Sequence, residues 1–588
     1  PAGRRAPFAG PLLLLTKGAP MTKPLLSVEN LSINFGRGDK AKRVVEDLSF
    51  SIAPGECVAI VGESGSGKSV TAFSVLGLTA FNGGRIEAGA IRFTRRNGEV
   101  TDLARADEKT LRDIRGDEIA MVFQEPMTAL NPVFTVGEQI AEVLRRHRRL
   151  DRKAARDRAL ELIARVRIND PTRRFNQYPH ELSGGMRQRI VIAMALACAP
   201  RLLIADEPTT ALDVTIQSQV LDLMRELSYE DGMALLFITH DMGVVAEMAD
   251  RVVVMRRGNK VEEQPVKHLF AQPQHVYTRK LLDAVPRLGA MAGAVGPVPF
   301  GVDPKLAAPS WPSGESLLEV RNLSTWFPIH KGVLQRHVGD VRAVDDVSFA
   351  VARGETLSLV GESGSGKSTT GRSILRLVRP RSGEVLVEGR DILKLDTEAL
   401  RLARRDLQIV FQDPYAALDP RLNAFEQIVE PLVIHRIDKG SALRDRAIEL
   451  VRRVGLEDEH LDRYPHEFSG GQRQRLCIAR ALSLSPKLII ADEPVSALDV
   501  SIQAQVVNLL IELQQELGLS YLFISHDMGV VERISHRVAV MQHGRIVEIG
   551  TRQQIFEAPQ QDYTRQLIAA VPVADPGRPS RVRELQYA

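Results

Sequence analysis

An eight-residue block that occurs twice is the strongest constraint on how this chain can fold. The chain has 588 residues, and residues 62–69 read Gly-Glu-Ser-Gly-Ser-Gly-Lys-Ser, a run repeated letter for letter at residues 361–368. Further shared blocks follow in the same order, namely Val-Phe-Gln at 122–124 and 410–412, Ser-Gly-Gly at 183–185 and 469–471, Asp-Glu-Pro at 206–208 and 492–494, and His-Asp at 240–241 and 526–527. Such ordered self-similarity predicts two homologous domains in tandem.

The composition agrees with two large folded domains. Hydrophobic residues make up 44% and charged residues 26% of the chain, which is enough apolar side chain to fill substantial cores. A formal net charge of +4 and 5% aromatic residues argue against binding nucleic acid by bulk charge or by base stacking. The longest apolar run, residues 190–199, ends at Pro200 and is shorter than the roughly 20 residues that a membrane-spanning helix needs. We therefore expect no spanning helix and no nucleic-acid partner.

The repeated blocks and the composition between them predict the domain limits. We expect an N-terminal extension at residues 1–24, a first domain at 25–286, a linker at 287–316, a second domain at 317–572 and a tail at 573–588. The linker is rich in Gly, Pro and Ala and lacks a periodic apolar pattern. Residues 1–20 read as an upstream extension ahead of Met21. The first half carries 11 more residues than the second between the first two shared blocks, and we place this surplus near residues 82–102.

Short apolar runs alternate with helical patterns in each half. Residues 57–61, 202–205 and 235–238 are apolar runs bounded by Gly, Asp or Thr, and they read as buried strands. Residues 154–166 have a helical pattern. Strands that alternate with helices indicate an α/β fold with a mainly parallel sheet covered on both faces.

The repeated block has the form of a phosphate-binding loop. The pattern GxxxxGK[ST] directly after a buried strand lets successive backbone N–H groups surround phosphate oxygens, with the lysine supplying positive charge and the last hydroxyl suiting Mg²⁺. Two identical copies make a chance match negligible, so we predict that both halves bind a nucleotide. The candidate residues are Gly62, Ser64, Gly65, Ser66, Gly67, Lys68 and Ser69, and Gly361, Ser363, Gly364, Ser365, Gly366, Lys367 and Ser368.

An Asp-Glu pair closes a predicted strand in each half. Asp206 and Asp492 stand where a carboxylate can help to hold Mg²⁺ in a nucleotide site, and Glu207 and Glu493 follow directly. A carboxylate beside the metal carboxylate can orient and polarise an attacking water. An isolated Asp-Glu pair is more often a helix cap. Its repetition downstream of a phosphate loop favours the catalytic interpretation.

The Ser-Gly-Gly blocks complete a resemblance to a known family. Residues 182–186 and 468–472 are similar to the signature motif of ABC-transporter ATPases, and the resemblance covers nearly all of residues 25–572. It implies two tandem P-loop NTPase domains, each with a helical subdomain beside the sheet core, and two ATP sites formed between the halves of one chain. In such a site the phosphate loop of one half and the signature of the other enclose one ATP. The signature candidates are Ser183, Gly184 and Gly185, and Ser469, Gly470 and Gly471.

The resemblance also implies roles for single residues. Gln124 and Gln412 match the glutamines that reach the metal and the attacking water, His240 and His526 match the histidines that contact the γ-phosphate, Asp213 and Asp499 match the aspartates that couple the two sites, and Phe35 and Phe327 match the ring that stacks on adenine. A core phenylalanine remains an alternative for the last pair. The implied Mg²⁺ ligands are Ser69, Gln124 and Asp206, and Ser368, Gln412 and Asp492. The departures are Met186 for Gln, Phe468 for Leu and 495–496 for a Thr pair, and both sites are expected to be competent.

Finer similarities point to an importer. Residues 125–132 and 413–420 resemble the peptide-importer branch of the family, and residues 272–286 and 558–572 echo each other as its C-terminal extension does. This branch implies two integral-membrane permease subunits, a periplasmic substrate-binding protein and a peripheral position on the cytoplasmic face of the bacterial inner membrane. Residues 286–291, 464–468 and 531–537 resemble the glutathione importers of this branch, which implies glutathione as the substrate, with di- or oligopeptides as the alternative. A soluble ABC ATPase acting on nucleic acid or ribosomes is a distant third.

Overall fold

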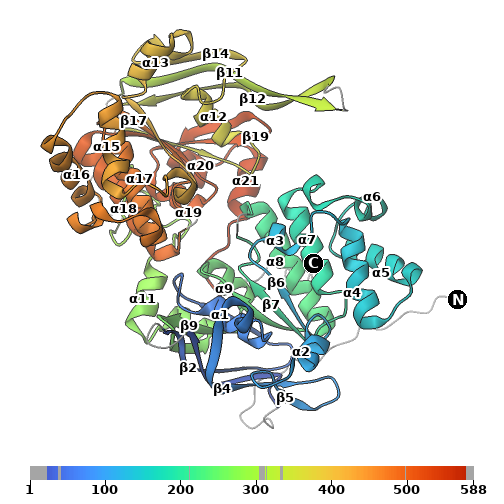
Figure 1. Ribbon diagram of the computed structural model, residues 1–588. Coiled ribbons are helices and arrows are strands. Elements are labelled where there is room, and N and C mark those ends of the chain that lie inside the picture. The colour runs from blue at the N-terminus through green and yellow to red at the C-terminus, as the bar shows by residue number, and fades with distance from the viewer. Residues whose placement is uncertain are drawn as a thin grey trace.

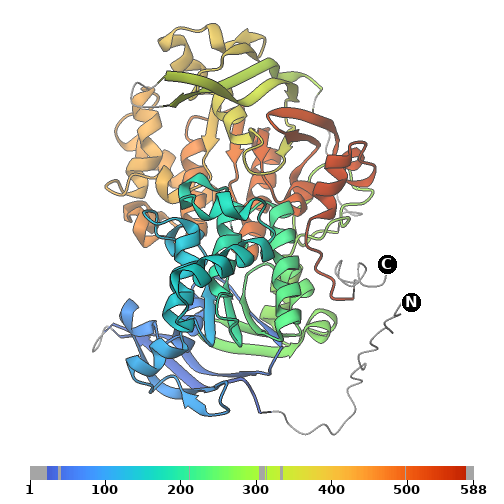
Figure 2. The ribbon, with the colours of Figure 1, turned by 90° about the vertical axis from the view of Figure 1, so that its right-hand side faces the viewer.

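Each half of the molecule is built from two sheets with helices around them. The computed structural model describes residues 23–36, 41–210, 212–303, 312, 314–331, 336–496 and 498–577. Residues 1–22 of the predicted N-terminal extension and residues 578–588 of the predicted tail lie outside the described residues. The two halves have the same build and lie against each other, the first coloured blue to green and the second yellow to red (Figures 1 and 2).

A six-stranded sheet forms the centre of each half. In the first half its order is β10 (Asn259–Pro265), β9 (Arg251–Arg256), β3 (Cys57–Val61), β8 (Ala234–Ile238), β7 (Leu202–Asp206) and β6 (Ile119–Val122). In the second half it is β20 (Arg545–Thr551), β19 (Arg537–Gln542), β13 (Thr356–Val360), β18 (Ser520–Ile524), β17 (Leu488–Asp492) and β16 (Leu407–Val410). All strands are parallel to their neighbours except the edge strands β10 and β20. Every residue of β3, β7 and β8 is buried, which confirms the mainly parallel α/β fold.

A second, antiparallel sheet covers the first in each half and was not among the predictions. Its strands are β2 (Lys42–Ile52), β1 (Leu26–Phe35), β4 (Gly84–Thr94) and β5 (Val100–Asp102), and β12 (Arg336–Ala352), β11 (Ser316–Lys331), β14 (Ser382–Val387) and β15 (Arg390–Asp391). The pair β4 and β5 spans residues 84–102, whereas β14 and β15 span only 382–391, so this hairpin holds most of the surplus of the first half. In the second half, strands β11 and β12 are longer than the equivalent strands β1 and β2 of the first half, and they project from the body of the molecule (Figure 1).

Helices surround the central sheets. One set of helices comprises α1 (Lys68–Val75), α2 (Glu108–Ile114), α8 (Val214–Asp231) and α9 (Met242–Met248), and α12 (Lys367–Ile374), α13 (Thr397–Ala403), α18 (Val500–Leu517) and α19 (Met528–Ile534). A helical subdomain stands to one side with α3 (Pro126–Ala129), α4 (Val136–Arg148), α5 (Arg152–Arg165), α6 (Pro171–Phe175) and α7 (Gly184–Ala195), and α14 (Pro414–Ala417), α15 (Ala424–Ile434), α16 (Ser441–Arg453) and α17 (Gly470–Leu482). Helix α5 nearly coincides with the helix predicted at residues 154–166.

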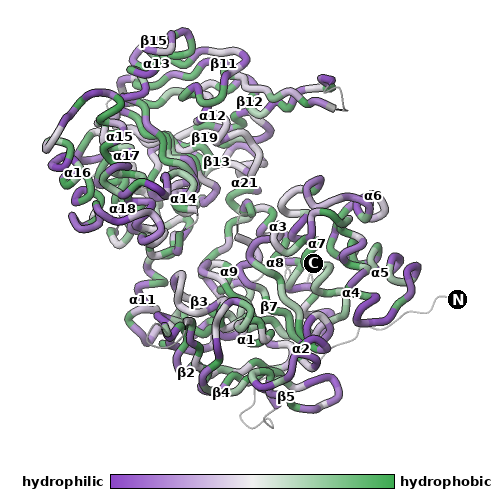
Figure 3. Tube along the Cα trace, in the orientation of Figure 1, coloured by the Kyte–Doolittle hydropathy of each residue, from purple (hydrophilic) through white to green (hydrophobic). Residues whose placement is uncertain are grey.

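The pattern of hydropathy follows these layers. Apolar stretches lie along the central strands, for example β7, and the outer helix α5 is hydrophilic over much of its length (Figure 3). Two of the apolar clusters join the central sheet of a half to its antiparallel sheet, because buried side chains of β1 and β11 pack on those of β3 and β13. Among the described residues, no helix combines the length and the apolar character needed to span a membrane.

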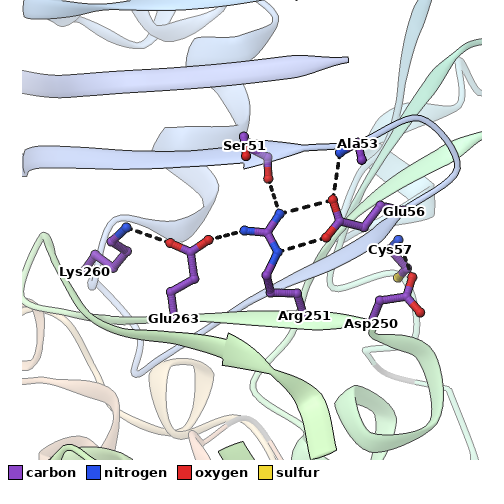
Figure 4. Close-up of polar contacts among 8 residues, drawn as sticks. All are labelled: Ser51, Ala53, Glu56, Cys57, Asp250, Arg251, Lys260 and Glu263. Carbon is purple, nitrogen blue, oxygen red and sulfur yellow. Dashed lines mark hydrogen bonds and ion pairs between the residues drawn. The ribbon is translucent and has the colours of Figure 1, made fainter. Parts of the chain in front are cut away.

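An ion-pair network fixes the strand that leads into the first phosphate loop (Figure 4). The guanidinium of Arg251 at the start of β9 donates to both carboxylate oxygens of Glu56, to the carbonyl of Ser51 and to Glu263. Glu263 is also paired with Lys260 at 2.7 Å. Residues of β2, β9 and β10 are thereby tied to Glu56, directly before the beginning of β3.

The chain of each half ends in a short extension. Its elements after the edge strand are α10 (Val266–Ala271) and α11 (Val276–Asp283) in the first half, and α20 (Arg552–Glu557) and α21 (Asp562–Ala569) in the second. Each extension reaches the other half, because α11 contacts α18 and α21 contacts α8. The extensions therefore contribute to the interface between the halves.

The first described stretch of the predicted linker, residues 287–303, is packed on the second half. The carboxylate of Glu532 accepts hydrogen bonds from the backbone N–H of Gly289, and the guanidinium of Arg552 donates to the carbonyls of Met291 and Ala294. The backbone N–H of Phe300 donates to Asn508 Oδ1 at 2.7 Å. Residues 287–303 therefore have the composition of a flexible linker but are held on the second half by several hydrogen bonds.

Candidate functional site

The two phosphate loops follow β3 and β13 and adopt a backbone that only glycine tolerates. Gly67 and Gly366 have φ angles of 96° and 103°, in the left-handed region. A Cβ added to Gly62 would lie 2.2 Å from the carbonyl oxygen of Met255. The equivalent contact in the second half, between Gly361 and the oxygen of Met541, would also be 2.2 Å. The loops are thus closed turns in which backbone N–H groups can converge on an anion.

A buried lysine lies inside each loop. Lys68 Nζ donates to the carbonyl oxygens of Gly62 and Glu63 at 2.6 and 2.9 Å. Lys367 Nζ makes the matching bonds to the loop of the second half, both at 2.8 Å. Burial lowers the pKa of both lysines, while nearby carboxylates, first among them Asp499 for Lys68, act in the opposite direction. Each ammonium group is therefore held at the loop by the backbone and is available to a phosphate.

A serine and an aspartate meet at the end of each loop. Ser69 Oγ donates to Asp206 Oδ1 at 3.1 Å, and Ser368 Oγ donates to Asp492 Oδ1 at 2.6 Å. Burial raises the pKa of Asp206 to about 6 and also raises the pKa of Asp492. A hydroxyl and a carboxylate at one point are the hard oxygen ligands that Mg²⁺ prefers. The predicted ligands thus fit the metal chemically.

The structure brings three predicted catalytic side chains together in each half. In the first half, Gln124 Nε2 donates to Glu207 Oε2 at 2.9 Å, and His240 Nδ1 lies 3.2 Å from Glu207 Oε1. In the second half, Gln412 Nε2 donates to the carboxylate of Glu493 at 2.8 Å. The Nδ1 atom of the second-half histidine, His526, is 3.2 Å from that same carboxylate.

The glutamate and the histidine stabilise each other's charged forms. Burial acts to raise the pKa of Glu207, but the hydrogen bond and charge of His240, with Thr210 and Lys68, together outweigh it and lower that pKa. Burial conversely acts to lower the pKa of His240, but the bond to Glu207 and the charges of Glu207, Asp499 and Asp241 together outweigh it and raise that pKa. The directions are the same for Glu493 and His526. Each glutamate is therefore held as a carboxylate that can accept a proton.

The same glutamates have strained backbones. Glu207 and Glu493 have φ angles of 46° and 49°, in the left-handed region that costs a residue with a side chain about 1–2 kcal/mol. Strain of this kind persists where the surrounding structure fixes the residue, and it is frequent at active sites. Its presence at both positions agrees with a functional orientation of the two carboxylates.

Orphaned hydroxyls in the loops match a phosphate ligand. Within the described part of the chain, the buried Oγ atoms of Ser66 and Ser365 have no hydrogen-bond partner. A buried polar group is normally paired, so an unpaired hydroxyl at the same position of both loops fits a donor that a phosphate oxygen would satisfy. The first turns of α1 and α12 add backbone N–H groups without a partner in the helix.

Contacts between the halves reach the first phosphate loop. The carboxylate of Asp499 accepts a hydrogen bond from the backbone N–H of Ser64 at 2.8 Å, and Ser501 Oγ donates to Glu63 Oε1 at 3.2 Å. The equivalent aspartate of the first half, Asp213, instead caps its own helix α8 by accepting from the backbone N–H of Ile216 at 3.0 Å. The two candidate coupling aspartates thus have different partners.

The signature serines begin helices in their own halves. Ser183 Oγ accepts from the backbone N–H of Met186 at 3.4 Å, and Ser469 Oγ accepts from that of Gln472 at 3.3 Å. The Gln472 side chain also accepts from the backbone N–H of Ser469 at 3.0 Å, which completes a capping box that Met186 cannot form. Gly184 and Gly470 are uncrowded, whereas a Cβ on Gly185 or Gly471 would lie 2.6 or 2.4 Å from an isoleucine of α8 or α18.

The two candidate adenine-stacking rings differ in their surroundings. Phe35 is half-buried, and a Cβ on Gly84 would lie 2.8 Å from its ring, so the ring packs on the next strand of its sheet. Phe327 is 40% exposed and stands opposite Val341 on the projecting hairpin. Phe327 is therefore free to stack, whereas Phe35 already has a packing role.

Two features near the loops were missed in the sequence. The hydroxyl of Tyr277 accepts from the backbone N–H of Glu63, and the extension of the second half makes the matching bond. Arg372 lies 3.5 Å from Asp492, whereas the first half has Phe73 at the equivalent position. The tyrosine could have been found, because Tyr-Thr-Arg occurs in both extensions at 277–279 and 563–565. The arginine gave no such signal.

Family models match both halves of the chain. The ABC transporter family model matches residues 45–210 and 344–496, and a model of the oligopeptide/dipeptide transporter C-terminal region matches residues 261–300 and 547–587. Among solved structures, a dimeric bacterial ABC transporter cassette is 31% identical over 40% of this chain and 98% of its own, with a TM-score of 0.37.

The chain belongs to the ABC transporter family, and its two nucleotide-binding domains make it an ABC-type ATPase that binds and hydrolyses ATP. Curated relatives are similar over nearly the whole length. The glutathione import ATP-binding protein GsiA of Pectobacterium atrosepticum is 56% identical over 574 residues, which cover 96% of this chain and 92% of the relative. The protein of the same name from Escherichia coli K12 is 55% identical over 569 residues, covering 95% of this chain and 91% of the relative. A subunit of this family works with membrane permeases.

Proposed function

We propose that this chain is the ATPase subunit that powers uptake of glutathione across the bacterial inner membrane. The observation that carries the proposal is the 56% identity over 96% of the chain to a glutathione import ATP-binding protein. Closure of the two halves around ATP would drive a conformational change in two integral-membrane permease subunits. A periplasmic binding protein would deliver the substrate to these permeases. The chain would then lie peripherally on the cytoplasmic face of the membrane.

Di- or oligopeptides are the second candidate substrate. The observation that favours them is the oligopeptide/dipeptide transporter C-terminal region matched at residues 261–300 and 547–587. The substrate pocket belongs to the binding protein and the permeases, so both candidates use the same ATPase chemistry in this chain.

Within each site we assign the chemistry to the side chains that the fold groups together. Lys68, Ser66 and the N–H groups of the loop bind the phosphates of ATP, and Lys367, Ser365 and their loop do so in the second half. Mg²⁺, when bound by Ser69, Gln124 and Asp206 or by Ser368, Gln412 and Asp492, supplies positive charge beside the phosphates.

The hydrolytic step is assigned to the glutamate, glutamine and histidine of each half. The carboxylate of Glu207 or Glu493 accepts a proton from the water that attacks the terminal phosphorus, while the bond from that phosphorus to the bridging oxygen breaks. Gln124 and Gln412 orient this water, and His240 and His526 bind the terminal phosphate and keep the carboxylate ionised. ADP and inorganic phosphate are the products.

The remaining assignments concern the join between the halves. The signature residues close over the nucleotide of the opposite half, and they are Ser183, Gly184 and Gly185, and Ser469, Gly470 and Gly471. Asp213 and Asp499 couple the closure of one ATP site to the other. Phe35 in the first half and Phe327 in the second half stack on adenine. The two ATPase domains comprise residues 25–286 and 317–572, and segments 1–24, 287–316 and 573–588 lie outside them. The hydrogen bond from Ser64 to Asp499 supports a site formed between the halves.

The test is the ATPase activity of the chain assembled with its permease pair in a lipid bilayer. Binding protein loaded with glutathione is expected to stimulate hydrolysis, whereas unloaded binding protein and binding protein mixed with dipeptides are not. Stimulation by dipeptides and not by glutathione would move the substrate to the second candidate. Stimulation by DNA, RNA or ribosomes without any permease would overturn the transport function.

A further inference from the structure

A tyrosine from each C-terminal extension is bonded to the phosphate loop of its own half. The hydroxyl oxygen of Tyr277, in the first turn of α11, accepts from the backbone N–H of Glu63 at 3.1 Å. The hydroxyl oxygen of Tyr563, in the first turn of α21, accepts from the backbone N–H of Glu362 at 3.2 Å. Glu63 and Glu362 are the second residues of the two loops, so each bond fixes a loop at its beginning and from outside.

The environment keeps these hydroxyls neutral. Tyr277 is 5% exposed, and the guanidinium carbon of Arg256 lies 4.9 Å from the centre of its ring. Burial is the main cause that raises the pKa of Tyr277 and of Tyr563 to about 12. A protonated phenol can accept the loop N–H and still has a proton to donate. The ring packs by its apolar surface, so the hydroxyl alone makes the link to the loop.

The other end of each extension touches the opposite half. After α11 the chain reaches Pro286, and a Cβ added to Gly529 of the second half would lie only 2.6 Å from the Cβ of this proline. After α21 the chain reaches Pro572, and a Cβ on Gly243 of the first half would lie 2.8 Å from its carbonyl oxygen. The contacts are reciprocal, and each fills the space that a side chain on the glycine would need.

The glycines that are touched lie in the first turns of α19 and α9, directly after the candidate catalytic histidines His526 and His240. Residues 526–530 and 240–244 are called the histidine loops below. The carboxylate of Asp527, which follows His526, accepts from the backbone N–H of Gly529 at 3.0 Å. The carboxylate of Asp241, which follows His240, accepts from that of Gly243 at 2.8 Å. Ten residues of extension therefore run from the phosphate loop of one half to the histidine loop of the other, and this occurs twice.

We propose that Tyr277 and Tyr563 are positioning residues that, through α11 and α21, tie each phosphate loop to the histidine loop of the opposite half. The C-terminal extensions are then parts of both ATP sites, and they couple the two sites to each other. This rests on the assignment of the two loops as ATP sites and does not depend on the transported substrate. A movement of one phosphate loop on ATP binding would be passed along α11 or α21 to the histidine of the other site.

Hydrogen exchange in the full-length chain tests the link without reference to transport. Tyr277→Phe removes the acceptor and keeps the ring, so amides of residues 62–66 are expected to exchange about fivefold faster, as the loss of one hydrogen bond implies. Residues 526–530 of the other half are expected to exchange faster as well. Tyr563→Phe is expected to affect residues 361–365 and 240–244.

Tyr521→Phe is the matched control, because Tyr521 is a buried tyrosine whose hydroxyl donates to the carbonyl of Leu510 at 3.0 Å, away from both loops. It removes one buried hydroxyl of the same kind and should leave all four segments unchanged.

ATPase kinetics of the same variants give the second readout. Tyr277→Phe and Tyr563→Phe are expected to raise the KM for ATP about fivefold while kcat stays within about twofold, and Tyr521→Phe to change neither. A change confined to the phosphate loop of the mutated half would overturn the coupling between sites. Unchanged exchange and unchanged KM in both tyrosine variants would overturn the proposal as a whole, and ATP binding by these variants would show that the ATP sites themselves remain.

Discussion

The two halves agree in their catalytic centres and differ in what surrounds them. The Gln–Glu distances are 2.9 and 2.8 Å, and both His–Glu distances are 3.2 Å. Around these centres, Phe73 of the first half is replaced by Arg372 in the second. Duplication has therefore kept the geometry that hydrolysis needs while the supporting residues have diverged.

The surroundings of the glutamates illustrate this divergence. Thr210 Oγ1 donates to the carboxylate of Glu207 at 3.0 Å, whereas Ser496 Oγ donates to the backbone carbonyl of Glu493 at 3.1 Å. Across the halves, Asp499 reaches the first phosphate loop while Asp213 caps a helix. The first phosphate loop is thus the one that the opposite half holds more firmly in this structure.

The largest expected effect comes from removing the proton acceptors on both sides. The double variant Glu207→Gln, Glu493→Gln is expected to lose at least about 100-fold in ATP hydrolysis, because no carboxylate remains to accept the proton from water. ATP binding should persist, since the phosphate loops are intact. Steady-state phosphate release gives the rate, with Glu512→Gln on the exposed face of α18 as the control. Near-normal turnover of the double variant would refute the assigned roles.

A pH effect should separate the stabilities of the halves. His536 Nδ1 accepts from the backbone N–H of Thr356 at 3.0 Å, where the first half uses Asp250 as acceptor for Cys57. Burial lowers the pKa of His536 to about 4, from 6.5. As pH falls, the histidine is therefore protonated in the unfolded chain before it is protonated in the folded one. The free energy of unfolding of the second half is thus expected to fall by about 3 kcal/mol between about pH 6.5 and pH 4.

Unfolding monitored by hydrogen exchange between pH 4 and 7 checks this. His536→Asn cannot take up a proton and should remove the pH dependence contributed by this position. An equal loss of stability in both halves over this range, unaffected by the variant, would contradict the explanation.

The coupling aspartates should respond differently to one substitution. Asp499→Ala removes a charge-assisted bond to the phosphate loop, which is worth about 1.5–3 kcal/mol, so ATP affinity is expected to fall about tenfold or more. Asp213→Ala removes a helix cap and is expected to cost about 1 kcal/mol of unfolding free energy with a smaller change in affinity. Calorimetric ATP titration and thermal unfolding measure the two effects. Equal effects on affinity would show that the two aspartates are equivalent in solution.

The smallest expected effect concerns the charge beside Asp492. Arg372→Phe gives the second site the residue of the first and removes a cation 3.5 Å from the carboxylate. Because this arginine is partly exposed, its influence is screened, and the Mg²⁺ concentration for half-maximal ATPase should fall only about twofold. Phe73→Arg should shift it upward by a similar factor. A rise in the Arg372→Phe variant, or a fall in the Phe73→Arg variant, would contradict the electrostatic explanation.

Much of the fold could be predicted because its signals are local. The strands at 57–61 and 202–205 are continuous apolar runs, as buried parallel strands are, and the glycines of residues 62–67 match a turn that a Cβ would block. The antiparallel sheet was missed although β1 alternates apolar and polar residues, because the alternation is interrupted in both β1 and β2 and the two strands pair with irregular register. The candidate catalytic residues were found because each lies in a repeated block.

The contacts between the halves could not be predicted from sequence. The bond from Ser64 to Asp499 joins residues 435 positions apart and depends on how the two domains dock. The segment 287–303 has the composition of a linker, and only the placement of Glu532 and Arg552 shows where it is held. The first half has Ala246 and Val266 at the corresponding positions. The position at which this segment is held is thus determined by residues of the second half and not by the sequence of the segment.

The most direct test of this account is the number of ATP molecules bound by one chain. In the Glu207→Gln, Glu493→Gln variant, equilibrium titration with ATP and Mg²⁺ should give two bound nucleotides per chain, because both halves have a complete loop, lysine and serine–aspartate pair. Binding of a single nucleotide at saturation would contradict the claim that the diverged halves both retain an ATP site.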